Sequence, residues 1–171
     1  MTTNPLPGNS QLVMGHAENE VIVRIVGRGT MHESACVRAF IEDCLDNDAS
    51  VLLDLNACNY LDSTFLGCLI ALHRLGKRHE NIAFRVCADH ATCQRLLSTS
   101  TLTRLLNIVP QCPSMSTDEV CVAAEVPEPD ALGRHVMQCH RLLADLGGEH
   151  AEQFRAIANR LELELEHSRR T

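Results

Sequence analysis

The 171-residue chain is poor in aromatic side chains and in the positive charge that nucleic-acid binding requires. Only 3% of its residues are aromatic, it has no Trp, and its formal net charge is −7. Platforms for base stacking and basic surfaces for phosphate contacts are therefore scarce. These shortages argue against nucleic-acid binding and require a core made of Leu, Val, Ile, Ala and Cys.

Long apolar runs are also missing. No run approaches the roughly 20 residues that a membrane-spanning helix needs. Residues 1–11 are polar, contain Pro5, Pro7 and Gly8, and have neither the basic start nor the apolar stretch of a signal peptide. We therefore expect a flexible N-terminus over residues 1–10, no membrane insertion, and a cytoplasmic protein.

The nine Cys residues follow neither a disulfide framework nor a metal-binding motif. Their number is odd, their spacing is scattered, and no CxxC occurs. Several stand where an apolar residue is expected, which indicates small core residues in a reducing compartment. The nine His residues are equally scattered. We expect no metal site and no cofactor.

Common catalytic motifs are absent as well. The chain has no GxxxxGK[ST] phosphate loop, no HExxH helix and no GxSxG elbow. A hydrolase that uses Ser63 is an alternative, but a nucleophile needs a positioned base. The sequence assigns no His to that role, so we expect no catalytic residues and no enzyme activity.

Short apolar runs alternate with helical patterns through the first two thirds of the chain. Strands are predicted at residues 12–14, 21–26, 51–55 and 82–87, and helices at residues 36–45, 65–75 and 89–97. Strand–helix–strand units imply right-handed crossovers and parallel pairing. We predict an α/β domain over residues 11–126, with a mixed sheet of about four to five strands packed by helices.

The end of this domain is less distinct. Residues 102–109 are apolar and stop before Pro110. Ser116 and Glu119 have the spacing of a helix capping box, while the Val-rich stretch after them also suits an edge strand. Both alternatives stay open for residues 116–122.

Residues 127–171 form a separate helical pattern. Leu132, Val136, Cys139, Leu143 and Leu146 are spaced alternately by four and three, as in a heptad stripe. Gly147 and Gly148 stop this helix, and a second helix repeats the spacing from Phe154 to Leu165. We predict a helical hairpin or dimerisation extension, whose stripe packs on its own domain or contacts another molecule.

Asp62 and Ser63 follow a buried strand and a short loop, and they open a helix. Both are good N-cap residues, and a helix N-terminus favours a negative group. The carboxyl edge of an α/β sheet is also where ligands bind. A phosphate on Ser63 would add about −1.5 to −2 charge beside Asp62. The spacing alone favours the simpler interpretation, in which the two residues only cap a helix.

The sequence from Leu53 to Gly67 resembles the signature of STAS domains in anti-anti-sigma factors. Leu53-Asp54-Leu55, a short loop and Leu61-Asp62-Ser63-Thr64-Phe65-Leu66-Gly67 are similar to the family's strand, spacer and Asp-Ser-[Ser/Thr]-Gly-Leu-Gly. The order of elements is similar over roughly residues 11–124. The resemblance implies a bacterial phosphoprotein of transcription regulation, which acts by partner switching in signal transduction.

The resemblance also implies partners and sites. An anti-sigma factor that is a serine kinase of the ATPase type would bind the unphosphorylated chain and phosphorylate Ser63, with Thr64 as the alternative. A PP2C-type phosphatase would reverse this. The implied partner-binding residues are Asp62, Ser63, Thr64, Phe65, Leu66, Thr30 and Met31.

Three features depart from the family pattern. Phe65 stands where Gly is usual, so it would cover the serine or change the partner surface. The loop at residues 27–30 lacks the usual acid, and the helices after Pro127 lie outside the pattern.

The alternative function is a STAS subunit that is never phosphorylated and helps to assemble a sensory or transport complex. A homodimer through the C-terminal helices is a further expectation.

Overall fold

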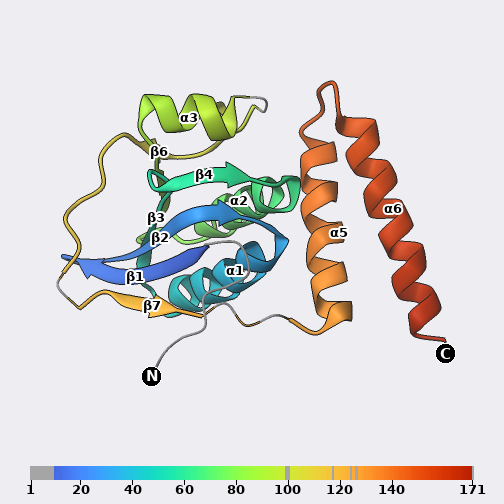
Figure 1. The fold of residues 1–171 in the computed structure, drawn as a ribbon, viewed down its shortest axis with the longest axis horizontal. Coiled ribbons are helices and arrows are strands. Elements are labelled where there is room, and N and C mark those ends of the chain that lie inside the picture. The colour runs from blue at the N-terminus through green and yellow to red at the C-terminus, as the bar shows by residue number, and fades with distance from the viewer. Residues whose placement is uncertain (1–9, 99–100, 117, 124, 126, 171) are drawn as a thin grey trace.

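The structure is a computed structural model that describes residues 10–98, 101–116, 118–123, 125 and 127–170. The prediction for residues 1–10 therefore falls, except for Ser10, outside the described residues. A twisted sheet forms the centre, and two long helices stand beside one of its ends (Figure 1).

Seven strands make up the sheet in the described part of the chain. They are β1 (Gln11–Ala17), β2 (Glu20–Gly29), β3 (Ser50–Asp54), β4 (Cys58–Leu61), β5 (Phe84–Cys87), β6 (Ile108–Val109) and β7 (Val120–Val122). Their order is β6-β5-β3-β2-β1-β7, and β4 pairs with the end of β2. Strands β2, β3, β5 and β6 are parallel, whereas β1 is antiparallel to β2 and β7. The predicted α/β fold with a mixed sheet is confirmed, although short strands make the sheet larger than expected.

Alternation along the strands explains the two faces of the sheet. Val23 of β2 and Leu53 of β3 point into the main core, while Ile22 and Leu52 join a smaller cluster on the other face. Helices α1 (Met31–Asp46) and α2 (Ser63–Gly76) bury apolar side chains in the main core. The smaller cluster is covered by residues that follow β6, including Met115. The continuous apolar run of β3 is thus explained by burial on both faces.

The short elements that follow β5 test the predictions for residues 89–97 and 116–122. Helix α3 (His90–Leu97) is present as predicted, and Asp89 caps it by accepting a hydrogen bond from Thr92 N at 2.8 Å. It is followed by α4 (Leu102–Leu105) and β6. The helix alternative after Ser116 is wrong, because residues 120–122 pair with β1 as an edge strand. Thr117 itself lies outside the described residues.

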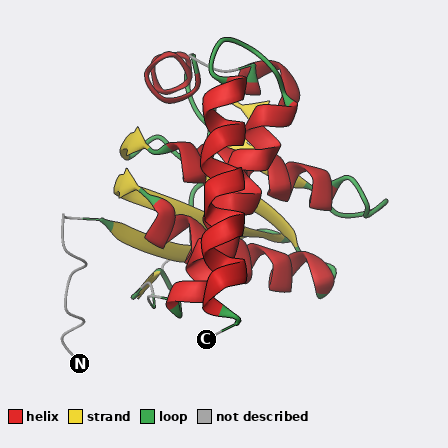
Figure 2. Cartoon of the chain, turned by 90° about the vertical axis from the view of Figure 1, so that its right-hand side faces the viewer, coloured by secondary structure: helices red, strands yellow, loops and turns green. Residues whose placement is uncertain are grey.

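The chain ends in helices α5 (Pro129–Asp145) and α6 (Ala151–Ser168). Gly147 and Gly148 separate them with φ angles of 77° and 96°, which favour glycine. Helix α5 packs on α2 and α1, and α6 runs along the outer side of α5 (Figures 1 and 2). Cys139 and Leu143 of α5 belong to the main core. The apolar stripe of α5 therefore packs on its own domain.

None of the described helices is both long enough and apolar enough to cross a membrane.

Candidate functional site

One carboxylate caps the two helices that cover the sheet. Asp62 Oδ1 accepts a hydrogen bond from Phe65 N in the first turn of α2, at 2.8 Å. Its Oδ2 accepts another from Met31 N, the first residue of α1, also at 2.8 Å. Burial raises the pKa of the Asp62 carboxyl, and these two N–H groups partly oppose that rise. Asp62 thus fixes the N-termini of α1 and α2 side by side.

The start of α1 carries its own cap. Thr30 N and Thr30 Oγ1 both donate to Glu33 Oε2, at 2.8 and 2.5 Å. Asp62 N donates to the carbonyl of Gly29 at 3.0 Å, which joins this turn to α2. The structure therefore brings together Thr30, Met31, Asp62 and Ser63, which the sequence places in two separate segments. Met31 remains exposed at this edge.

Ser63 is half-buried at the first position of α2, and helix α5 lies over it. Its Oγ is 2.9 Å from Nε2 of His140. His140 Nδ1 is 2.8 Å from the carbonyl oxygen of Val136, which can only accept, so Nδ1 carries the ring proton. In the neutral ring Nε2 is then the acceptor, and the Ser63 hydroxyl donates to it. His140 is only 5% exposed, and its ring packs against that of Phe154.

The two residues after Ser63 point into the protein. Thr64 is 3% exposed, and Phe65 is fully buried in the main core. The Phe65 ring lies so close to Gly29 that a Cβ on Gly29 would stand 2.9 Å from it. The Phe65 ring therefore anchors the first turn of α2 in the main core. The side chain that lies over Ser63 is His140. Leu66 is partly buried and lines a cavity of about 300 Å³ with Leu143 and Phe154.

Helices α2 and α5 touch through their backbones. A Cβ built on Gly67 would lie 2.2 Å from the carbonyl oxygen of Cys139, so no larger residue fits without movement of α5. Cys139 is fully buried, and burial raises its pKa to about 12. The thiol is therefore protonated and unreactive in this arrangement.

A second serine–histidine contact joins α5 to α1. Ser34 Oγ donates to the Met31 carbonyl at 3.0 Å and lies 2.8 Å from Nε2 of His135. Since the hydroxyl has one proton, His135 Nε2 is the donor in this contact. Burial, helped by the charge of Arg38, lowers the pKa of His135 to about 4. Arg38 also donates to Gln138 Oε1 of α5 at 3.1 Å.

Sequence reasoning missed His135 and His140. They lie 101 and 77 residues from their serine partners, so no local spacing connects them. One signal was available, because both histidines flank Cys139 on the predicted apolar stripe of this helix. A polar ring on a buried stripe requires a hydrogen-bond partner.

The STAS domain family matches residues 11–114, which is more than half of the chain. The chain belongs to the STAS family. No curated protein matches it. The crystal structure of an anti-sigma factor antagonist from Mycobacterium paratuberculosis is similar, with a TM-score of 0.53 and 18% identity over 63% of this chain and 92% of that one. This likeness supports the fold.

A second solved structure is the anti-sigma factor antagonist SpoIIAA in its unphosphorylated form. It has a TM-score of 0.43 and 16% identity, over 59% of this STAS chain and 89% of that chain. The family match ends before β7, so α5 and α6 lie outside the matched STAS region. Helix α5, which lies over Ser63, is therefore outside the matched STAS domain, as is α6.

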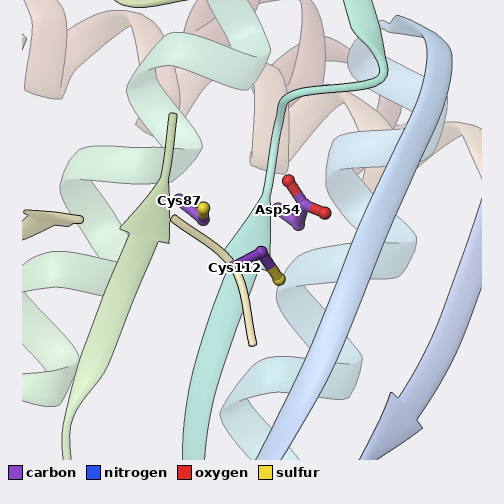
Figure 3. A group of neighbouring side chains, drawn as sticks. All are labelled: Asp54, Cys87 and Cys112. Atoms are coloured by element: carbon purple, nitrogen blue, oxygen red, sulfur yellow. The ribbon is translucent and has the colours of Figure 1, made fainter. Parts of the chain in front are cut away.

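The STAS domain also brings Asp54, Cys87 and Cys112 together, with ligand atoms within 4.8 Å of one another (Figure 3). A carboxylate and two thiols are ligand types that zinc accepts. Here Asp54 Oδ2 accepts from Arg24 Nε at 2.9 Å, and burial raises the pKa of Cys112 to about 12. The carboxylate is thus neutralised by an arginine and the Cys112 thiol is protonated. We assign this cluster to the packing of the sheet.

The Ser63–His140 pair has the distance expected of a nucleophile and its base. The other ring nitrogen of His140 is bound to a carbonyl of its own helix, and the ring packs on Phe154. The pair also joins the STAS domain to α5.

Proposed function

We propose that this STAS chain is a binding protein of the anti-sigma factor antagonist type, controlled by phosphorylation of Ser63. Its unphosphorylated form binds an anti-sigma factor that is also a serine kinase of the ATPase type. Phosphorylation by that kinase releases the chain, and a PP2C-type phosphatase restores it, with all partners in the cytoplasm. STAS membership supports this class of function.

The observation that carries the proposal is the position of Ser63 at the N-terminus of α2, directly after the double cap Asp62. The first amides of a helix have no partner within the helix and, with the helix dipole, favour a phosphate. A phosphate there would add about −1.5 to −2 charge beside the Asp62 carboxylate. The charge of the partner surface would change while the fold persists.

The neighbouring residues divide into two groups. Met31 is exposed and suits contact with a partner, whereas Leu66 is partly buried and lines a cavity with Leu143 and Phe154 of the C-terminal helices. Asp62 and Thr30 hold the helix ends in place. Thr64 and Phe65 are buried, which supports Ser63 over Thr64 as the phosphorylated residue.

The cover over Ser63 favours a second candidate, a STAS subunit that is never phosphorylated. A half-buried hydroxyl that is hydrogen-bonded to α5 is less accessible to a kinase while α5 stays in place. In that role the C-terminal helices would serve assembly, and a homodimer would use the outward side of α6, where Leu163 is 67% exposed. Light scattering of the full chain and of Leu163→Lys measures the oligomeric state. Loss of the dimer in the variant would identify the outward side of α6 as the dimer interface.

Intact-mass spectrometry separates the two candidates. The full chain is incubated with ATP and the ATPase-type serine kinase encoded beside its gene. We expect the mass of one added phosphate, which is lost in Ser63→Ala and retained in Thr64→Val. Ser116→Ala, at an exposed serine far along the chain, is the matched control and should be phosphorylated like the wild type. No gain in mass would support the unphosphorylated subunit, and a gain that persists in Ser63→Ala would place the phosphate elsewhere.

A further inference from the structure

The surface around Ser63 is already occupied by a segment of the same chain. His140 of α5 hydrogen-bonds Ser63, and the backbone of Cys139 touches α2 at Gly67. His135 and Gln138 extend the contact to Ser34 and Arg38 of α1. Helix α5 thus covers the N-terminal part of α2 and the adjoining side of α1.

We propose that α5 is a removable cover, which occupies within the chain the surface that the partner needs, and that phosphorylation of Ser63 and docking of α5 exclude each other. This inference rests on the proposed function of Ser63. It adds that the chain has a closed state, which is the one described above, and an open state in which Ser63 and the α1–α2 surface are free.

Steric fit supports the exclusion. A hydrogen bond of 2.9 Å joins Ser63 Oγ to His140 Nε2, so no space for a phosphoryl group lies between them. The imidazole has little room to turn away, since Nδ1 is bound to the Val136 carbonyl and the ring packs on Phe154. A phosphoryl group on Ser63 would therefore displace α5 as a whole.

The makeup of the contact supports reversibility. Beside the apolar packing of Cys139 and Leu143, it contains two serine–histidine pairs and the Arg38–Gln138 hydrogen bond. Polar groups on both sides regain hydrogen bonds with water when they separate, so opening leaves few of them unsatisfied. The STAS family match ends at residue 114, upstream of α5, so the family's domain is defined without this helix.

The equilibrium between the closed and the open state controls the affinity of the chain for its partner. A partner that binds only the open state has an apparent affinity reduced by the fraction of chains that are open. Weakening the α2–α5 contact should therefore strengthen partner binding and speed phosphorylation together. Phosphorylation keeps the chain open, while the new charge beside Asp62 repels the partner.

Cys139 provides a direct readout of opening that needs no partner. In the closed chain its thiol is buried with a pKa of about 12, so alkylation is slow. Alkylation by N-ethylmaleimide is followed for each cysteine by peptide mass spectrometry. Exposed Cys121 serves as the reactive reference, and buried Cys87 reports whether the STAS domain stays folded.

Four full-length chains are compared: the wild type, a chain with phosphoserine incorporated at position 63 during translation, Gly67→Ala and Gly133→Ala. Gly67→Ala places a methyl group against the Cys139 backbone, while alanine favours the α2 helix itself. Gly133→Ala is the matched control, because its methyl group would meet only the flexible end of Leu165 in α6. We expect Cys139 to react about tenfold faster or more in the phosphoserine and Gly67→Ala chains, with Cys87 still protected.

Three results would contradict the proposal that α5 is a removable cover. Cys139 reacting at the wild-type rate in the phosphoserine chain would show that a phosphate fits beneath α5, and a slower rate would show that it locks α5 in place. A parallel rise at Cys87 would show that α5 cannot leave without unfolding the domain. The outcome is independent of any kinase, so failure of the kinase to modify Ser63 would contradict the proposed function and leave the cover standing.

Discussion

The carbonyl oxygen of Cys139 in α5 lies against Gly67 in α2, so closely that a Cβ at position 67 would stand 2.2 Å from it. Gly67 belongs to the Asp62–Gly67 segment that carries the STAS resemblance, whereas Cys139 belongs to the helical addition. The addition therefore docks on the motif itself. This contact links the proposed phosphorylation site to the C-terminal hairpin.

Loss of the double cap should destabilise the protein. Asp62→Ala removes the acceptors of Phe65 N in α2 and Met31 N in α1. One N-cap typically contributes about 1 kcal/mol, so we expect the free energy of unfolding to fall by about 1–3 kcal/mol. Urea denaturation followed by circular dichroism measures the change.

Asp89→Ala is the matched control for this experiment, because Asp89 caps α3 alone. We expect it to cost less than Asp62→Ala. Equal losses in the two variants would contradict the assignment of Asp62 as the cap of both helices.

The Ser63–His140 hydrogen bond should appear as a coupling between the two side chains. In a double-mutant cycle of Ser63→Ala and His140→Ala, we expect a coupling free energy of about 0.5–1.5 kcal/mol. His150 also packs on Phe154 but has no contact with Ser63 in the described hydrogen bonds, so Ser63→Ala with His150→Ala is the control cycle. A coupling near zero for His140 would show that the docking contact contributes nothing.

Acid should weaken the protein through His135. Its pKa is about 4 in the folded chain, against about 6.5 when unfolded. Between these values the unfolded chain binds more protons than the folded chain. The contribution of the neutral His135 ring to stability is therefore complete above about pH 6.5 and is lost as the pH falls towards 4. The expected loss is about 3 kcal/mol over this window, measured by urea denaturation at a series of pH values.

His135→Gln should flatten this pH dependence, although burial also lowers the pKa of His73 and leaves part of it in place. His90→Gln changes an exposed histidine and serves as the control. If His135→Gln and wild type lost stability equally on acidification, His135 would not be the buried neutral ring described above.

Phe65 should act as a core residue. Phe65→Ala removes a fully buried ring and is expected to cost about 3–5 kcal/mol in thermal or urea unfolding. Tyr60 is an exposed aromatic residue nearby in the sequence, so Tyr60→Ala should cost much less. Similar losses would mean that Phe65 faces solvent, as a partner-contact residue would.

Much of the STAS domain could be predicted, because its strands carry strong local patterns. The apolar run at residues 51–55 indicated a strand buried on both faces, and β3 lies between β2 and β5. Strand β4 could not be predicted from Cys58-Asn59-Tyr60-Leu61, since it is short and depends on a bulge at Gly27 of β2. The edge strand β7 competed with a capping-box pattern, and pairing with β1 decided in its favour.

The site could be predicted only in part, because its contacts are local on one side and distant on the other. Asp62 and Ser63 could be placed at a helix start from their own segment. The approach of Met31 to Asp62 depends on how α1 and α2 lie on the sheet. The contact between His140 and Ser63 depends on where α5 crosses α2. The heptad stripe predicts that α5 has an apolar side, but it does not predict which helix that side packs against.

The most direct test of the central claim is the affinity of the anti-sigma kinase for the full chain with and without phosphoserine at position 63. Isothermal titration calorimetry in the presence of ADP measures both without further phosphorylation. Repulsion by a phosphate beside Asp62 should weaken binding at least tenfold, or about 1.4 kcal/mol. Equal affinities for the two chains would contradict the account, because Ser63 would then not control the partner.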